Sequence, residues 1–328
     1  MTNLLVIKEQ LIGFFSRFEA YIKAVLKFLL SMIALLLINS DLGYMSKIDN
    51  GALVLIVSLL CSFLPMNLTI IIMGAFILLH LYALSLECAI VVGIVFVILF
   101  VIYLRFSPSD SAAVILMPIC YIIKIPYVVP LTLGYVGTPM SCVATACGTV
   151  VYFMLQYVKN NAEQIASLGS DAESALGSFK YLIDGLLGDD RMLLMVITCA
   201  VVVIAVFMIK SLPVDYSWKI ALGMGVVVNI LIILIGCSAL EVDMSIGGVF
   251  VSTVISAVIV LIIQFFIFNV DYSRTENVQF EDDEYYYYVK AIPKVSLEAP
   301  DVNVKRFNSY DDDEYYEESE EEYYPQEP

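Results

Sequence analysis

The sequence has few charged residues, and that shortage excludes an ordinary soluble protein. Charged residues make up 15% of the 328 positions and hydrophobic residues make up 60%, whereas a typical soluble domain is about 25% charged and 45–50% apolar. A soluble core of this size could not hide so much apolar surface from water. The mean hydropathy of +0.88 agrees. We therefore expect the chain to reside in lipid.

Catalytic signatures are also missing. The phosphate-binding pattern GxxxxGK[ST] and the nucleophile pattern GxSxG do not occur, so nucleotide hydrolysis or serine hydrolysis by those routes is not expected. His80 is the single histidine, which excludes a histidine-rich zinc site and an HExxH protease. We predict that the chain is not an enzyme and needs no cofactor or metal.

Cysteine pairs with metal-binding or redox spacing are absent too. The seven cysteines lie in or beside apolar runs, and none forms a CxxC motif. Free cysteine behaves as a small apolar residue in such surroundings. The pattern therefore predicts buried cysteines without a disulfide framework or metal site.

Long apolar runs are what the sequence does contain. A membrane-spanning helix needs about 20 apolar residues, and the runs predict an all-α, polytopic transmembrane helix bundle with about eight spans. Residues 52–64 are short and stop before Pro65, so they predict a tilted span or half of a hairpin. The predicted runs cover residues 24–40, 52–64, 68–86, 88–104, 138–158, 192–210, 219–237 and 246–270.

Residues 1–23 differ from these runs because their apolar side chains recur every three or four positions, with charged residues between them. This pattern predicts an amphipathic helix that lies in the membrane interface. The alternative is that these residues are the first turns of a longer helix.

The first transmembrane bundle, residues 24–158, contains a segment broken by proline at residues 111–136. Pro118, Pro126 and Pro130 each remove a backbone donor, yet the segment is apolar. Irregular backbone at membrane depth is tolerated only where protein buries it or where it lines a cavity. We therefore predict a re-entrant hairpin or two half-helices here.

Residues 159–190 form a polar connection to the second transmembrane group, residues 191–270. Apolar positions from Ile165 to Leu186 recur at steps of three and four residues, which predicts a one-faced helix, with an interruption at Gly177. Such a helix can lie on the membrane, cap the bundle or bind a partner helix.

The distribution of basic residues predicts the orientation. With eight spans and a cytoplasmic N-terminus, most Lys and Arg residues in short loops fall on the cytoplasmic side, as the positive-inside rule requires. We therefore expect a cell-membrane protein with both termini in the cytoplasm and residues 159–190 outside.

The tail, residues 271–328, is acidic and rich in tyrosine. It holds 18 Asp and Glu, five Lys and Arg, and ten of the 21 tyrosines. The cluster FEDDEYY at residues 280–286 is matched by YDDDEYY at residues 310–316. High net charge predicts a disordered tail, and its sign argues against nucleic acid as a partner. Such a tail either binds a partner protein or is an acidic tail whose charge only keeps it solvated.

The repeated aromatic and acidic cluster favours docking, because tyrosine supplies contact area at low entropic cost. We predict a cytoplasmic protein partner with a basic surface. The predicted partner-binding residues are Phe280, Tyr285, Tyr286, Tyr310, Tyr315 and Tyr316.

A candidate substrate pathway follows the broken segment into the small-residue helix after it. Broken helices can expose backbone groups to a solute, and small residues permit close helix approach. We include His80 in this pathway because it is a polar group within an apolar run, although a polar packing contact would also explain it. The predicted pathway residues are His80, Lys124, Pro126, Pro130, Gly134, Gly137, Thr138, Ser141 and Thr145.

These features predict a permease-like transporter component for a small, neutral or amphipathic substrate. Membrane lipid is expected to surround the protein. An oligomer or a separate ATPase subunit could complete it. The alternative is a non-transporting scaffold of an envelope or secretion assembly, and an intramembrane enzyme is a third hypothesis. A transporter should have a cavity near residues 124–137, whereas a scaffold should be solidly packed there.

Overall fold

The computed structural model describes residues 2–168, 175–214, 216–267, 276–281 and 286–291. The chain divides into a helical unit, which covers residues 3–269, and a second unit formed by residues 270–328. The two units are described separately below.

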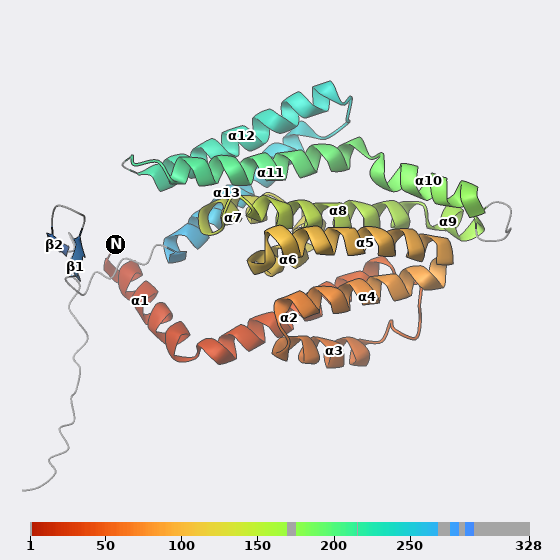
Figure 1. Cartoon of the computed structure of the whole chain (residues 1–328), viewed down its shortest axis with the longest axis horizontal. Helices are drawn as coiled ribbons and strands as arrows, with labels where there is room; N and C mark the ends of the chain where they lie inside the picture. The colour runs from red at the N-terminus through yellow and green to blue at the C-terminus, as the bar shows by residue number, and fades with distance from the viewer. Residues whose placement is uncertain (1, 169–174, 215, 268–275, 282–285, 292–328) are drawn as a thin grey trace, which may run out of the picture. The chain divides into compact units, whose positions relative to one another are not determined.

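The helical unit is built from apolar helices joined by short connections (Figure 1). A short 3-10 helix, η1 (Pro108–Asp110), precedes α6. The helices are α1 (Thr2–Arg17), α2 (Glu19–Asp41), α3 (Gly51–Phe63), α4 (Met66–Leu84), α5 (Leu86–Phe106), α6 (Ser111–Ile122), α7 (Val128–Val136), α8 (Ser141–Asn160), α9 (Ala162–Leu168), α10 (Ala175–Leu187), α11 (Asp190–Lys210), α12 (Ser217–Ala239) and α13 (Ile246–Ile267).

Among the described residues, seven helices are long and apolar enough to cross a membrane: α2, α4, α5, α8, α11, α12 and α13. At 1.5 Å per residue they are about 28–35 Å long, which matches the roughly 30 Å hydrocarbon core of a bilayer. Helices α3 and α6 are apolar but shorter. The protein is therefore a multi-pass, all-α membrane protein.

Polar side chains set where several of these helices begin. Asn50 accepts a hydrogen bond from the backbone of Ala52 at the start of α3, and Asp189 accepts one from Arg191 at the start of α11. Ser85 caps α5 in the same way. Each cap satisfies a backbone N–H that has no partner inside its own helix.

Helices α6, α7 and α8 lie between two groups of spans (Figure 1). On one side α8 packs against α5 and α6, and α6 also contacts α2 and α4. On the other side α8 and α7 pack against α11, and α7 contacts α13. The segment predicted to be broken thus occupies the middle of the bundle.

The helices α9 and α10 cover one end of the bundle, which we call the α10 end. Ile165 of α9 and Leu182 of α10 are buried in a cluster with residues of α4, α5 and α8. Lys159 forms a salt bridge of 2.5 Å with Asp41, which joins α8 to α2 at this end. Gly177 lies inside α10, so the helix continues through the position at which we expected an interruption.

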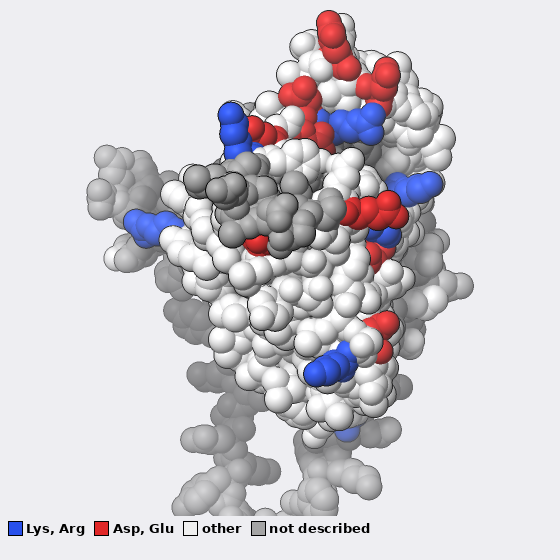
Figure 2. All heavy atoms as spheres, turned by 90° about the vertical axis from the view of Figure 1, so that its right-hand side faces the viewer, with Lys and Arg blue, Asp and Glu red and all other residues white. Residues whose placement is uncertain are grey.

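Acidic side chains outnumber basic ones at the α10 end. Figure 2 looks toward this end and shows acidic and basic groups beside broad uncharged areas. The acidic residues there include Asp41, Asp49, Glu87, Glu163, Asp184, Asp189, Asp190, Glu241 and Asp243. The opposite end, which we call the Arg105 end, carries Arg105, Lys210 and Lys219. The bundle therefore has an asymmetric distribution of charge along its long axis.

The boundary of the N-terminal amphipathic helix differs from the predicted residue 23. Helix α1 ends at Arg17, and α2 begins at Glu19. Phe18 has non-helical backbone angles, with φ −116° and ψ 22°. The positions that we assigned to the end of an interfacial helix are therefore the first turn of the first span.

The second unit contains a two-stranded antiparallel hairpin, β1 (Glu276–Glu281) and β2 (Tyr286–Ala291). Phe280 lies opposite Tyr287, and Val278 lies opposite Val289. The tail, for which net charge predicts disorder, thus has regular structure in these two strands. Their β-branched and aromatic residues fit a pleated ribbon, which net charge alone does not reveal. The other residues of the tail lie outside the described part.

Candidate functional site

Helix α6 enters the bundle from the Arg105 end and stops halfway. It begins at Ser111, just after α5, and its 12 residues extend about 18 Å. Near its end, the Tyr121 hydroxyl lies 3.5 Å from Thr149 Oγ1 and 3.9 Å from Cys199 Sγ. Thr149 and Cys199 lie near the middle of α8 and α11, so α6 ends at mid-depth.

The chain turns back at Lys124. Its φ of 65° is left-handed, and the Ile125 N–H donates to the Cys120 carbonyl at 2.8 Å. This is the helix ending that usually uses glycine, because a side chain is strained in that conformation. The Ser252 hydroxyl of α13 donates to the Lys124 carbonyl at 2.8 Å, which holds the turn against α13.

Helix α7 then returns to the Arg105 end. Tyr135, near its last residue, donates its hydroxyl proton to the Trp218 carbonyl at 2.6 Å. The Lys210 ammonium donates to the Tyr135 carbonyl, and the Tyr135 ring stacks on Trp218. Because Lys210 and Trp218 mark the end of α11 and the start of α12, residues 111–136 form a re-entrant hairpin. We call them the re-entrant segment.

Of the residues expected to shape irregular backbone in this segment, Pro126 and Gly137 lie in non-helical backbone, whereas Pro130 does not. Pro126 lies in the turn before α7, but Pro130 lies in the first helical turn of α7, where a missing N–H costs little. Pro118 lies inside α6. The irregular backbone is instead confined to residues 123–127 and 137–140.

Glycines allow the re-entrant segment to pack closely against the neighbouring spans. A Cβ placed on Gly134 of α7 would lie 2.6 Å from Val206 Cβ of α11. A Cβ on Gly148 of α8 would lie 2.6 Å from Met117 Cβ of α6. Real Cβ atoms do not approach so closely, so any larger residue would push the helices apart. The side of the segment that faces α8 and α11 is therefore tightly packed.

The remaining predicted pathway residues after α7 pair with nearby backbone. Ser141 Oγ accepts the Thr138 N–H at 3.0 Å, and Thr145 Oγ1 donates to the Cys142 carbonyl at 2.8 Å. A Cβ on Gly137 would contact Ser141. Ser141 and Thr145 are buried, so these groups fix the junction of α7 and α8.

His80 belongs to a separate polar cluster near the α10 end. Its Nδ1 accepts the Met45 N–H at 3.3 Å, and its Nε2 lies 3.0 Å from Asn39 Oδ1. Asn39 Nδ2 donates to the Ile48 carbonyl at 3.2 Å. Since Nδ1 accepts, Nε2 must carry the proton and donate to Asn39. Both nitrogens of a neutral ring are thus used to join α4 to α2 and its loop.

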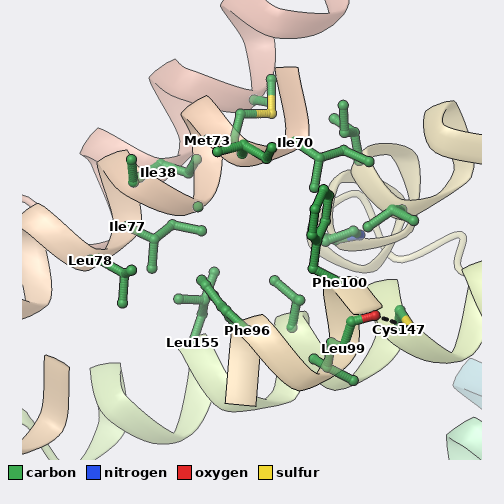
Figure 3. A pocket seen from close by; sticks show the side chains of 18 of the residues that line it. Ile38, Ile70, Met73, Ile77, Leu78, Phe96, Leu99, Phe100, Cys147 and Leu155 are labelled. Atoms are coloured by element: carbon green, nitrogen blue, oxygen red, sulfur yellow. Dashed lines mark hydrogen bonds between the residues drawn. The ribbon is translucent and has the colours of Figure 1, made fainter. Parts of the chain in front are cut away.

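An apolar cavity lies on the other side of α6. Its volume is about 340 Å³, and residues of α2, α4, α5, α6 and α8 line it. Figure 3 shows Ile77, Phe96 and Phe100 pointing into the open space. Pro118, Ile119 and Ile122 of the re-entrant segment form part of its wall. The cavity therefore adjoins the element that the sequence singled out.

The polar groups in the cavity wall already have partners. Tyr103 donates its hydroxyl proton to Asn67 Oδ1 at 2.7 Å or to the Pro108 carbonyl at 3.0 Å. Cys147 Sγ donates to the Leu99 carbonyl at 3.7 Å. A buried water needs two to four polar partners, so the wall favours hydrocarbon over water.

The sequence-predicted pathway residues and the cavity do not coincide. His80, Lys124, Gly134 and the other predicted residues are not among those that line it. Small residues in its wall, Ala34, Gly74, Ala75 and Gly93, are the sequence signal that could have indicated it. In a chain so rich in apolar residues, that signal cannot be distinguished from ordinary helix packing.

Comparison with known proteins adds no family: no protein-family model, no curated protein and no solved structure matches this chain.

Proposed function

We propose that the protein is a permease-like transporter component that handles an amphipathic molecule. The observation that carries the proposal is the apolar cavity beside α6, whose wall includes Ile71 and Val97, both exposed on the outer surface of the bundle. A laterally reachable apolar cavity suits a molecule that partitions into the bilayer first. Ligand sites between helices are typically of this apolar kind.

The re-entrant segment supports the same proposal. Irregular backbone at membrane depth is a feature of transport proteins, and strained residues tend to persist where function requires them. Lys124 has both features, because its left-handed backbone is strained and its turn lies at mid-depth. Its side chain is exposed. A helix that ends inside the bundle can shift with less disruption than a full span.

Transport can be tested without first identifying the substrate. We would express the protein in cells that lack it and compare cell extracts with medium by untargeted mass spectrometry. We expect at least one amphipathic compound to change its distribution, and Ala75→Phe, which adds bulk from an exposed position in the cavity wall, to reverse the change. Unchanged distributions of all detected compounds in the expressing cells would contradict transport.

We also infer that the tail binds a cytoplasmic protein with a basic surface. In the β1–β2 hairpin, alternate residues face the same side, which places Tyr286 and Tyr288 together. Their relative exposures are 71% and 75%. An isolated two-stranded hairpin is only marginally stable in water, so a partner that covers this face would stabilise it.

A pull-down with the full-length protein tests the docking. Replacing Tyr285, Tyr286, Tyr315 and Tyr316 with serine keeps the charge of the tail and removes aromatic surface. We expect the variant to lose most of its retained partners, because aromatic anchors dominate interface energies. Equal capture by both forms, with the same salt dependence, would leave the solvating-tail alternative.

A non-transporting scaffold is the second candidate, and the packing of α7 favours it. Pro130, Leu131, Gly134 and Tyr135 are buried, and the stretch from residue 124 to 137 contributes nothing to the wall of the large cavity. A scaffold would lose its partners in the tyrosine variant without any compound changing its distribution in the transport experiment.

A further inference from the structure

We propose that the cavity beside α6 binds one acyl chain of a membrane phospholipid, which enters sideways from the bilayer. The proposal rests on the proposed function for its role, because it identifies the hydrocarbon part of the amphipathic molecule. Binding can nevertheless be measured separately from transport.

The length of the cavity fits an acyl chain. Along α5 its wall extends from Gly93 to Tyr103, which corresponds to about 15 Å of helix. The hydrocarbon core of a bilayer is about 30 Å thick, so the cavity is as long as one leaflet. Because it follows the helix axes, a chain inside it keeps the direction of chains in the surrounding lipid.

The chemistry of the wall excludes the polar part of a lipid. The lining is apolar apart from the hydroxyl of Tyr103, which is hydrogen-bonded, and the thiol of Cys147. Among the described residues, no charged one lines the cavity. A headgroup must therefore remain at the membrane surface, and the Tyr103 end of the cavity is also the bundle end that carries Arg105.

The position of the opening favours the bilayer as the source of the ligand. Lining residues from three helices are also exposed, among them Ile71 by 46%, Val97 by 64% and Ile122 by 37%. They connect the cavity with the apolar outer surface of the spans. A chain that moves in from a neighbouring lipid crosses no polar region on this route.

Two glycines allow the cavity to be filled by design. A Cβ on Gly74 would lie 3.6 Å from the Phe96 ring, and a Cβ on Gly93 would lie 3.6 Å from Leu78. Both are ordinary contact distances, so the backbone tolerates a side chain at either position. Gly74→Leu with Gly93→Leu should occupy the space of the chain. Gly223→Leu on α12 is the matched control, because a Cβ there meets nothing within 4 Å.

Photo-crosslinking of the full-length protein tests the proposal. We would reconstitute it in phosphatidylcholine and phosphatidylglycerol vesicles that contain a phospholipid with a diazirine in its acyl chain, and map the adducts by mass spectrometry. We expect adducts on peptides with Phe96, Phe100 and Ile119 to exceed those on the outer surface of α12 and α13. The filled variant should reduce them about tenfold, and Gly223→Leu should not.

Three results would overturn the proposal. The first is that adducts are no more frequent at the cavity than on α12 and α13. The second is that the filled variant inserts correctly and still forms these adducts. If that variant failed to insert, Ala75→Phe would replace it, since Ala75 lines the cavity from an exposed position. The third is that a free fatty acid or an isoprenoid alcohol competes with the diazirine phospholipid and lowers the adducts, whereas excess phospholipid does not. That result would assign the cavity to another ligand. Binding without transport would leave this inference standing and remove the proposed function.

Discussion

At the scale of single residues, the hydrogen bonds of His80 indicate a structural role. Its two ring nitrogens and Asn39 together satisfy the backbone of Met45 and Ile48, and His80 is completely buried. A group with both nitrogens engaged has no free position for a substrate. The cluster instead fixes the loop between α2 and α3 to the end of α4.

The first prediction follows from that cluster. His80→Leu should lower the free energy of unfolding by about 3 kcal/mol, because it leaves the Met45 N–H and Asn39 Oδ1 without partners. Titration with sodium dodecyl sulfate in mixed micelles would measure the loss. Adding Asn39→Leu should cost less than the sum of both single changes. A fully stable His80→Leu protein that loses transport would show that the ring acts on a substrate instead.

The second prediction concerns Lys124. Its left-handed backbone is strained for any residue with a Cβ, so Lys124→Gly should stabilise the fold by about 1 kcal/mol. The same unfolding titration would show it. Lys124→Ala is the control, since it removes the charge and keeps the strain. If both variants change stability equally, the charge of Lys124 sets the effect and the strain does not.

At the scale of elements, the contact between α7 and α11 depends on a missing side chain. Gly134→Leu should destabilise the protein by about 3 kcal/mol, because the new side chain collides with Val206. Adding Val206→Ala should restore part of the loss. Gly223→Leu, which meets open space, should change little. An unaffected Gly134→Leu protein would mean that α7 moves away from α11 freely.

The helical elements were largely predictable because hydrophobic runs and prolines act locally. The runs located the long spans, and Pro118, Pro126 and Pro130 located the re-entrant segment. The precise break was not predictable, since a proline is equally acceptable in a first helical turn and in a loop. The role of Gly134 was also ambiguous, because a glycine for close packing and a glycine for exposed backbone look alike in sequence.

The cavity could not be predicted, for a different reason. Its wall combines residues from five helices, so its volume depends on how side chains far apart in sequence fill the space between them. In the sequence, Ile77 and Phe96 cannot be told from the apolar residues of a closed core. Only the assembled helices show that the space between them is left open.

At the scale of the whole molecule, the asymmetric charge supports one orientation. Arg17, Lys23, Arg105, Lys210 and Lys219 lie toward the Arg105 end, whereas Lys47, Lys159, Lys180 and Arg191 lie at the more acidic α10 end. From the positive-inside rule we predict that the Arg105 end faces the cytoplasm. This prediction places helices α9 and α10 outside the cell, and the start of α2 and the end of α13 on the cytoplasmic side.

Cysteine labelling would test this orientation in intact cells. A membrane-impermeant maleimide should label Lys180→Cys on α10 directly, and should label Lys219→Cys at the start of α12 only after permeabilisation. Both positions are exposed, and the wild-type protein controls for its own cysteines, five of which are buried. Labelling of Lys219→Cys alone in intact cells would reverse the orientation.

The short helix α3 has a consequence for the membrane itself. Its 13 residues extend about 20 Å, and Ile56 and Phe63 on its outer face are 66% and 80% exposed. Lipid beside α3 therefore meets a hydrophobic length about 10 Å smaller than beside the long spans. A bilayer adapts to such a mismatch by becoming locally thinner. The bilayer would then be thinner beside α3 than beside the seven long spans, which match the ordinary hydrocarbon core, so the two leaflets would lie closer together at α3 than elsewhere around the protein.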